Sequence, residues 1–108
     1  MELPEFDMTG EFHLVKEGGR RNPLKNGHWC HSNAKGVERQ DSCGIFFNDR
    51  EVLNLGETCS AGWKFLFRNS DGFEIQVATG QVFEVNEGAT KIGEFKVVEV
   101  LNEKIKKN

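Results

Sequence analysis

The chain has 108 residues and a mass of 12.2 kDa, enough for one hydrophobic core but too little for two that are stable alone. Apolar residues make up 37% and charged residues 29%, which fits a soluble globular domain and excludes a disordered or fibrous chain. The net charge of −3 produces a field that repels phosphate backbones, so a nucleic-acid partner would require a local basic patch.

The sequence also indicates where the protein resides. No apolar run approaches the roughly 20 residues that cross a bilayer, and "MELPEFDMTGEF" lacks the basic and apolar segments of a secretion signal. Three cysteines without regular spacing fit a reducing compartment better than a disulfide framework. We therefore expect a cytoplasmic protein without membrane contact.

The first half of the chain predicts three strands. Apolar or small residues alternate with polar ones over residues 6–14, the pattern of a half-buried strand. Residues 17–27 collect Gly, Asn and Pro into a loop, and a second strand begins at residues 28–32. After a polar loop, residues 42–48 have the aromatic and β-branched content of a third strand.

The second half predicts further strands joined by short turns. Asn54 and Gly56 mark a turn before a strand over residues 59–67. The four turn-favouring residues "NSDG" at 69–72 predict a hairpin that leads into the alternating residues 73–77. Strands over 82–85 and 92–101, joined by the tight "NEG" turn, complete the series, with a bulge at Val97 and Val98 where the alternation slips.

About six or seven short strands without a helical period predict an all-β fold, a small antiparallel barrel or sandwich. We expect a closed barrel of about six strands, because closure removes exposed strand edges. Residues 1–103 would form this single domain, and 104–108 a basic tail that frays or caps the last strand. The expected core consists of Phe6, Phe12, Leu14, Ile45, Phe47, Leu55, Trp63, Phe65, Phe73, Ile75, Phe83, Val85, Phe95 and Val97.

Two glycine motifs carry a family resemblance. Phe6 in the first strand is followed by "EGGRRNP" at 17–23 and by Gly27, which opens "GHWCH". The second motif comprises Phe83, Val85, Glu87, Gly88, Thr90, Ile92, Gly93 and Val97, and "LNLGET" places Gly56 and Glu57 before a strand. In this order the motifs resemble the third domain of elongation factor Tu, a small β-barrel that follows a GTPase domain and a second barrel. The resemblance spans about residues 6–101.

The resemblance implies an RNA-contacting loop. In that family the matching loop residues, and the glycine matching Gly88, contact the T-arm of aminoacyl-tRNA, and the guanidinium groups of Arg20 and Arg21 suit phosphate oxygens. The alternative is that the glycines only shape a turn, while both arginines are solvated or pair with Glu17. The sequence has no G-x-x-x-x-G-K-[ST] phosphate loop, so we expect neither GTPase activity nor nucleotide binding.

The stretch "GHWCH" departs from the family. His28, Trp29, Cys30 and His31 stand where the family has Tyr-Arg-Pro-Gln, so one basic residue is lost and an imidazole replaces an amide. Trp29 could stack on a base, anchor a protein partner or fill one end of the barrel. Among the nine phenylalanines, Phe46 and Phe67 are candidates for exposure at a partner surface.

The same stretch raises a metal and a nucleophile hypothesis. His28 and Cys30 would share one face of a strand, and Cys43 on a neighbouring strand or His31 would add a further ligand. No C-x-x-C pair is present, however, so ordinary packing of reduced thiols is favoured and we predict no metal and no cofactor. A nucleophilic Cys30 would need an orienting group and an oxyanion pocket that the sequence does not supply.

The sequence thus predicts a non-enzymatic binding module with two candidate partners. The acidic balance, the lost basic residue and the missing GTPase motif favour a protein partner, for example a toxin that an inhibitor or immunity protein would block. The alternative is a translation-associated module that contacts tRNA or other RNA through the EGGRR loop. The candidate binding residues are Arg20, Arg21, His28, Trp29, His31 and Gly88.

Overall fold

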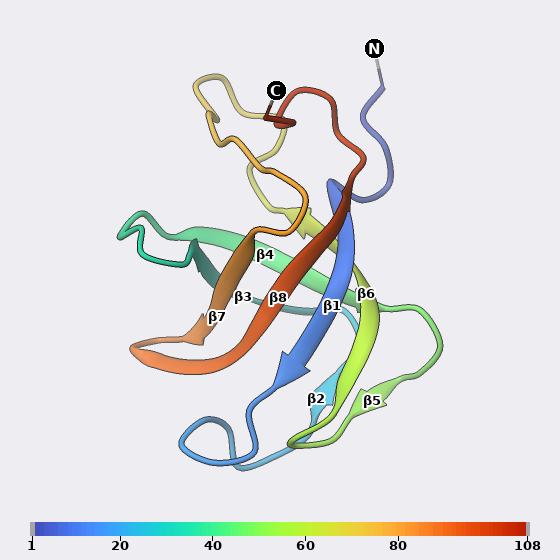
Figure 1. Cartoon of the computed structure of the whole chain (residues 1–108), viewed down its shortest axis with the longest axis vertical. Helices are drawn as coiled ribbons and strands as arrows, with labels where there is room; N and C mark the ends of the chain where they lie inside the picture. The colour runs from blue at the N-terminus through green and yellow to red at the C-terminus, as the bar shows by residue number, and fades with distance from the viewer. Residues whose placement is uncertain (1, 108) are drawn as a thin grey trace.

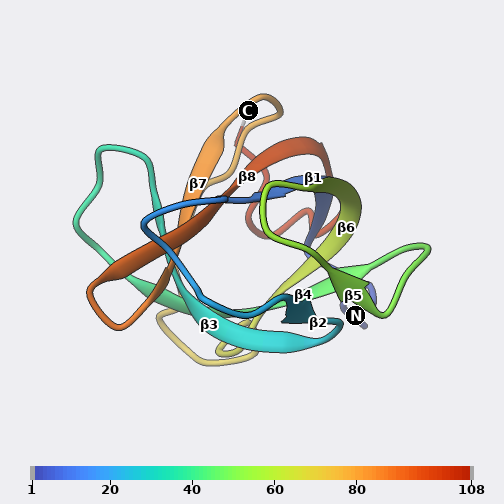
Figure 2. The ribbon, with the colours of Figure 1, turned by 90° about the horizontal axis from the view of Figure 1, so that it is seen from below.

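The computed structural model describes residues 2–107, which contain eight strands, joined by loops, and no helix. Six of them close into an antiparallel barrel (Figures 1 and 2). In order around the barrel these are β1 (Met8–Leu14), β6 (Thr58–Phe65), β4 (Asp41–Phe47), β3 (His28–Ala34), β7 (Val82–Glu87) and β8 (Thr90–Val100). The predicted all-β class and closed six-stranded antiparallel barrel are therefore confirmed.

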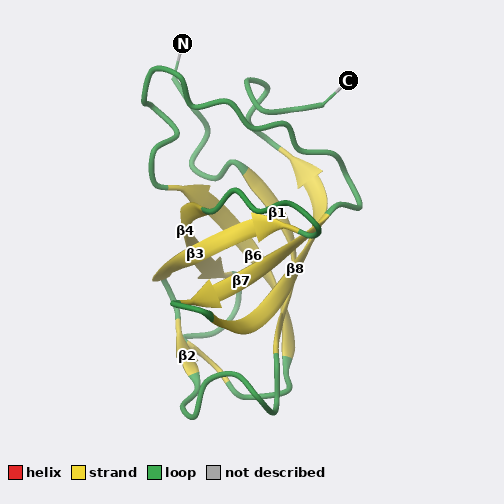
Figure 3. Ribbon diagram, turned by 90° about the vertical axis from the view of Figure 1, so that its left-hand side faces the viewer, coloured by secondary structure: helices red, strands yellow, loops and turns green. Residues whose placement is uncertain are grey.

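The remaining two strands form a separate small sheet. β2 (Leu24–Lys25) and β5 (Val52–Leu53) pair with each other and close one end of the barrel, whereas both termini lie at the opposite end (Figures 1 and 3). The sequence did not indicate these strands, because a two-residue strand has no periodicity to detect. Their buried members, Leu24 and Leu53, nevertheless belong to the core.

The barrel interior is filled with aromatic side chains. Trp63 is fully buried, and its ring packs against Phe65, Phe83 and Phe95 at centroid distances of 5.7, 5.5 and 4.7 Å. Strand β1 buries every second residue, as the alternation of the sequence predicted. Of the expected core, Phe6, Leu55 and Ile75 are only partly buried, and the others are buried.

Strand β8 contains the predicted bulge where it pairs with β1. Thr9 of β1 faces Glu99, but the next residue, Gly10, faces Val97, so Val98 is the extra residue. An inserted residue bends a strand and increases its local twist, which helps a long strand such as β8 to pair with both β1 and β7. The predicted irregularity at Val97 and Val98 is confirmed.

The predicted hairpin at residues 69–72 is wrong. The alternating residues Phe73, Ile75 and Val77 do turn inward, but no strand pairs along them. Instead, an Arg39 Nη donates to the Glu74 carbonyl at 2.5 Å, and Val77 forms a single parallel bridge with Lys106. Side-chain alternation alone therefore predicted burial correctly and ladder pairing incorrectly.

The C-terminal segment does not fray where it is described. Ile105 is buried in the core. The Val77 backbone N–H donates to the Ile105 carbonyl, and the Lys107 N–H donates to the Val77 carbonyl. The predicted tail over 104–108 thus packs on the barrel through residues 104–107, whereas Asn108, like Met1, lies outside the described residues. Across residues 2–107 there is no helix of the length and apolarity that a bilayer crossing requires.

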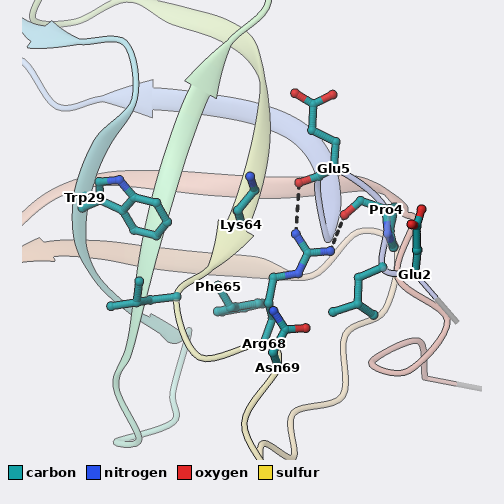
Figure 4. A pocket seen from close by; sticks show the side chains of 10 residues that line it. Glu2, Pro4, Glu5, Trp29, Lys64, Phe65, Arg68 and Asn69 are labelled. Atoms are coloured by element: carbon teal, nitrogen blue, oxygen red, sulfur yellow. Dashed lines mark hydrogen bonds between the residues drawn. The ribbon is translucent and has the colours of Figure 1, made fainter.

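A buried ionic cluster holds the N-terminal arm to this end of the barrel. The fully buried Asp7 carboxylate accepts bonds from the Phe65 backbone N–H and the Asn102 amide, both within 2.8 Å, and lies 3.2 Å from Arg68 Nε. The Arg68 guanidinium also donates to the carbonyls of Glu5 and Pro4 (Figure 4). These contacts hold residues 4–7 in place, including Phe6, whose ring packs on the outside of the barrel over Gly62.

Candidate functional site

Three aromatic rings and one ammonium group cover the outer side of β3, β4 and β6. We call Phe6, Trp29, Phe46 and Lys64 the aromatic face. Trp29 on β3 and Lys64 on β6 are both register partners of Gly44 on β4, so the three residues form one row across the barrel wall. Side chains of directly opposite residues point to the same side of a sheet, and here that side is the outside.

Glycines in the strands allow the rings to lie flat on the wall. A Cβ on Gly44 would lie 2.9 Å from Phe46 and 3.0 Å from Trp29, and a Cβ on Gly62 would lie 2.6 Å from the Phe6 ring. Real Cβ atoms do not approach other heavy atoms that closely, so any larger residue at either position would displace a ring. The two glycines are therefore required by contact with the rings.

The rings contact one another and Lys64. The Phe6 and Phe46 centroids are 5.5 Å apart, and Trp29 meets Phe46 edge to face at 6.0 Å. The Lys64 Nζ lies 5.4 Å from the Phe46 centroid and 5.9 Å from that of Phe6, within the range of a cation–π interaction. The aromatic face is thus an apolar surface with one positive charge held over it.

The apolar surface continues into the turn that follows β6. Trp29 is 46% exposed, Leu66 51% and Phe67 57%. Trp29, Lys64, Leu66, Arg68 and residues 2–5 are among the residues that line a pocket here. Trp29 and Lys64 lie on one side of it, and Arg68, Pro4 and Glu2 on the other (Figure 4). The prediction that Phe67 is exposed is confirmed, whereas Phe46 is partly buried because Phe6, Trp29 and Lys64 cover it.

The EGGRR loop, which was predicted to bind phosphate, lies at the end of the barrel opposite the termini (Figure 1). One of its two arginines, Arg20, is already bonded within the protein. Arg20 donates to the Glu87 carboxylate at 2.5 Å and to the Asn22 carbonyl at 3.0 Å. His28 Nε2 lies 3.0 Å from the same Glu87 oxygen. Arg20 therefore pairs with Glu87 of β7, not with the neighbouring Glu17, and its charge is neutralised within the protein.

The other predicted binding residues are dispersed around the barrel. Arg21 is exposed in the loop beside Arg20, and Gly88 sits at the tip of the β7–β8 hairpin with a φ of 58°. His31 is exposed on β3, opposite Ser42 and Asn86. The structure thus brings Arg20 and His28 together through Glu87. Trp29 belongs to the aromatic face, and His31, two residues further along β3, lines the same surface depression as Trp29 and Leu66.

The proposed metal ligands do not converge. Cys30 and Cys43 are buried with their Sγ atoms 3.8 Å apart, while His28 turns to Glu87. No group of three or more His, Cys, Asp or Glu side chains within residues 2–107 is arranged to hold a metal ion. Burial and the neighbouring Cys30 raise the pKa of the Cys43 thiol well above its usual value, which disfavours a thiolate ligand.

A charged network covers the outer side of β7 and β8. Lys91 Nζ lies 2.6 Å from Glu94 and 3.2 Å from Glu84, and the Asn33 amide donates to Glu84 at 3.1 Å. The bond from Asn33 and the charge of Lys91 lower the pKa of Glu84, and Lys91 lowers that of Glu94. The bonds to Glu94 and Glu84 raise the pKa of Lys91. This polar surface contrasts with the aromatic face.

Sequence reasoning missed Phe6, Lys64 and Glu87 as members of these sites. Phe6 was assigned to the core, although it packs on the outside of the barrel over Gly62. Gly44 and Gly62, each inside a predicted strand, were the available indication, because a strand glycine often marks the close approach of another group.

A scan of protein-family models finds no match for this chain, and a search of curated proteins finds none either.

Proposed function

We propose that this chain is a non-enzymatic binding module that engages another protein through the aromatic face and the adjoining Leu66 and Phe67. The observation that supports this proposal is the outward-facing Trp29, which rests on Gly44 and stays nearly half exposed beside the exposed Leu66. Phe67, the next residue in the chain, is exposed as well. Exposed apolar clusters of this kind on small proteins mark interaction surfaces, and Trp is the residue most enriched among interface anchors.

The charges favour a protein over an RNA partner. The chain is acidic overall, and Arg20, the first residue of the expected phosphate clamp, is already bonded to Glu87. Freeing Arg20 would leave the Glu87 carboxylate beside any incoming phosphate, which lowers the gain from each phosphate contact. The resemblance to the third domain of elongation factor Tu fits this proposal, and an inhibitor or immunity protein is one form that such a module could take.

The experiment compares capture of partners by matched surface variants. Trp29→Ala and Phe67→Ser remove the proposed anchors, and Val98→Ser removes an equally exposed apolar side chain from β8. A protein captured from cell extract by wild type should be lost with the first two variants and kept with the third. Titration with that purified protein should then show an affinity loss of about 2 kcal/mol or more for Trp29→Ala. Equal affinity of all four chains would overturn the proposal.

RNA is the alternative partner, because the exposed Arg21 is accessible to phosphate groups. Phosphate contacts are strongest at low salt, so an electrophoretic shift with tRNA in low-salt buffer is the most permissive assay. We expect no shift. A shift that disappears with Arg20→Ala plus Arg21→Ala would instead support the translation-associated module.

A further inference from the structure

The two thiols between β3 and β4 are close enough to be linked. Cys30 and Cys43 are register partners, and their Sγ atoms lie 3.8 Å apart. Opposite residues of an antiparallel pair have Cβ atoms about 4.5–5.5 Å apart, at the upper edge of what a disulfide spans. Small side-chain rotations and a slight approach of the strands would therefore bring the sulfur atoms to bonding distance.

The two thiols differ in access. Cys30 lines a surface depression beside Trp29 and Leu66, whereas Cys43 is fully buried. Burial and the proximity of Cys30 raise the pKa of Cys43, so Cys43 keeps its proton in the reduced protein. Of the two cysteines, Cys30 is thus the more accessible to an external reagent, and the Cys43 sulfur lies 3.8 Å from the Cys30 sulfur.

We propose that Cys30 and Cys43 are a redox pair, which a low-molecular-weight disulfide such as glutathione disulfide converts into an intramolecular disulfide. The Cys30 thiolate attacks one sulfur of the reagent, whose S–S bond breaks, and the first glutathione leaves and takes up the proton that Cys30 released. Cys43 then attacks the Cys30 sulfur of the mixed disulfide and transfers its proton to the second glutathione. The protein loses two electrons and two protons, and one glutathione disulfide becomes two glutathione thiols.

Cys59 provides an internal reference for this chemistry. Its exposure of 6% matches the 7% of Cys30, and burial raises the pKa of its thiol. It lies opposite Phe12 on β1, however, so no second thiol stands across the ladder from it. A reaction that depends only on the exposure of a thiol would treat Cys59 and Cys30 alike, whereas the proposed pair forms a crosslink that excludes Cys59.

The test exposes the folded 108-residue chain to excess glutathione disulfide, quenches with acid, alkylates the remaining thiols and measures intact and peptide masses without reduction. We expect a Cys30–Cys43 peptide crosslink that excludes Cys59, and an intact mass that shows the loss of two hydrogen atoms from this pair. Cys59→Ser should retain the crosslink. Cys43→Ser should retain one glutathione on Cys30, because the thiol that resolves the mixed disulfide is missing.

Two results would overturn the proposal. One is a folded wild-type chain that keeps three alkylatable thiols while the same reagent crosslinks it in urea, because the crosslink would then require unfolding. The other is glutathione that stays on Cys30 of the wild type as it does on Cys43→Ser, because Cys43 would then not resolve the mixed disulfide. Either outcome is independent of the proposed protein-binding function.

Discussion

Arg68 and Asp7 form an ion pair inside the end of the barrel where both termini lie. The Arg68 Nε lies 3.2 Å from Asp7 Oδ1, with side-chain exposures of 8% and 0%. The pair links the first described residues to the turn after β6, because Arg68 also donates to the carbonyls of Pro4 and Glu5. It therefore positions the arm that carries Phe6 to the aromatic face.

We predict that Asp7→Ala destabilises the protein by about 3–5 kcal/mol, because it leaves the Arg68 charge buried without its partner. The Phe65 backbone N–H and the Asn102 amide would lose their acceptor as well. Urea denaturation measures the change in the free energy of unfolding, with the exposed Asp71→Ala as the matched control. A loss below about 1 kcal/mol would show that water or backbone replaces the carboxylate.

This ion pair illustrates what the sequence could not predict. Alternation identified β1, aromatic and β-branched content identified β4, and turn residues marked the start of β6. The slip in the alternation identified the bulge at Val98. Asp7 and Arg68, by contrast, meet where the paired strands β1 and β6 begin and end, and no local pattern links residues so far apart in the chain. The same holds for Arg20 and Glu87, separated by 67 positions, which is why the sequence suggested the neighbouring Glu17 as the partner.

The Arg20–Glu87 contact should be measurable as a coupling energy. In a double-mutant cycle of Arg20→Ala and Glu87→Gln, we expect a coupling of about 1 kcal/mol, since the pair is charge-assisted but partly exposed. The same Glu87→Gln variant frees Arg20. Stronger tRNA binding by this variant at low salt, compared with wild type, would favour the RNA alternative.

The Lys91 network predicts a pH dependence of stability. The folded-state pKa values of Glu84 and Glu94 are lowered, so their contribution is present above the ordinary carboxyl pKa and is lost as the pH falls through the folded values. The folded-state pKa of Lys91 is raised, so its contribution is present below the ordinary lysine pKa and is lost as the pH rises through the folded value.

We therefore expect Lys91→Met to lower stability at neutral pH by on the order of 0.5 kcal/mol, since the three side chains are partly exposed. The difference from wild type should shrink below about pH 4, where the carboxylates become protonated. Urea denaturation at acidic, neutral and alkaline pH measures this. A difference that stays constant from acidic to neutral pH would contradict the network.

The glycines under the rings allow the aromatic face to be altered from below. Gly44→Ala would place a Cβ 2.9 Å from Phe46 and 3.0 Å from Trp29, which must tilt away. We expect a stability loss of about 1–3 kcal/mol, as for other overpacked sites, together with weaker partner binding. Ser60→Ala on the exposed side of β6 is the control. Unchanged partner affinity in Gly44→Ala would mean that the rings only protect the strands.

Photo-crosslinking at single positions identifies what contacts the aromatic face in cells, without a purified partner. A photoreactive benzoylphenylalanine is placed in cells at position 29 or 67, and at the equally exposed position 98 as a control. If the aromatic face binds a protein, positions 29 and 67 should each give one discrete protein adduct and position 98 none. No adduct at position 29, or an adduct there that nuclease removes, would contradict protein binding by this face.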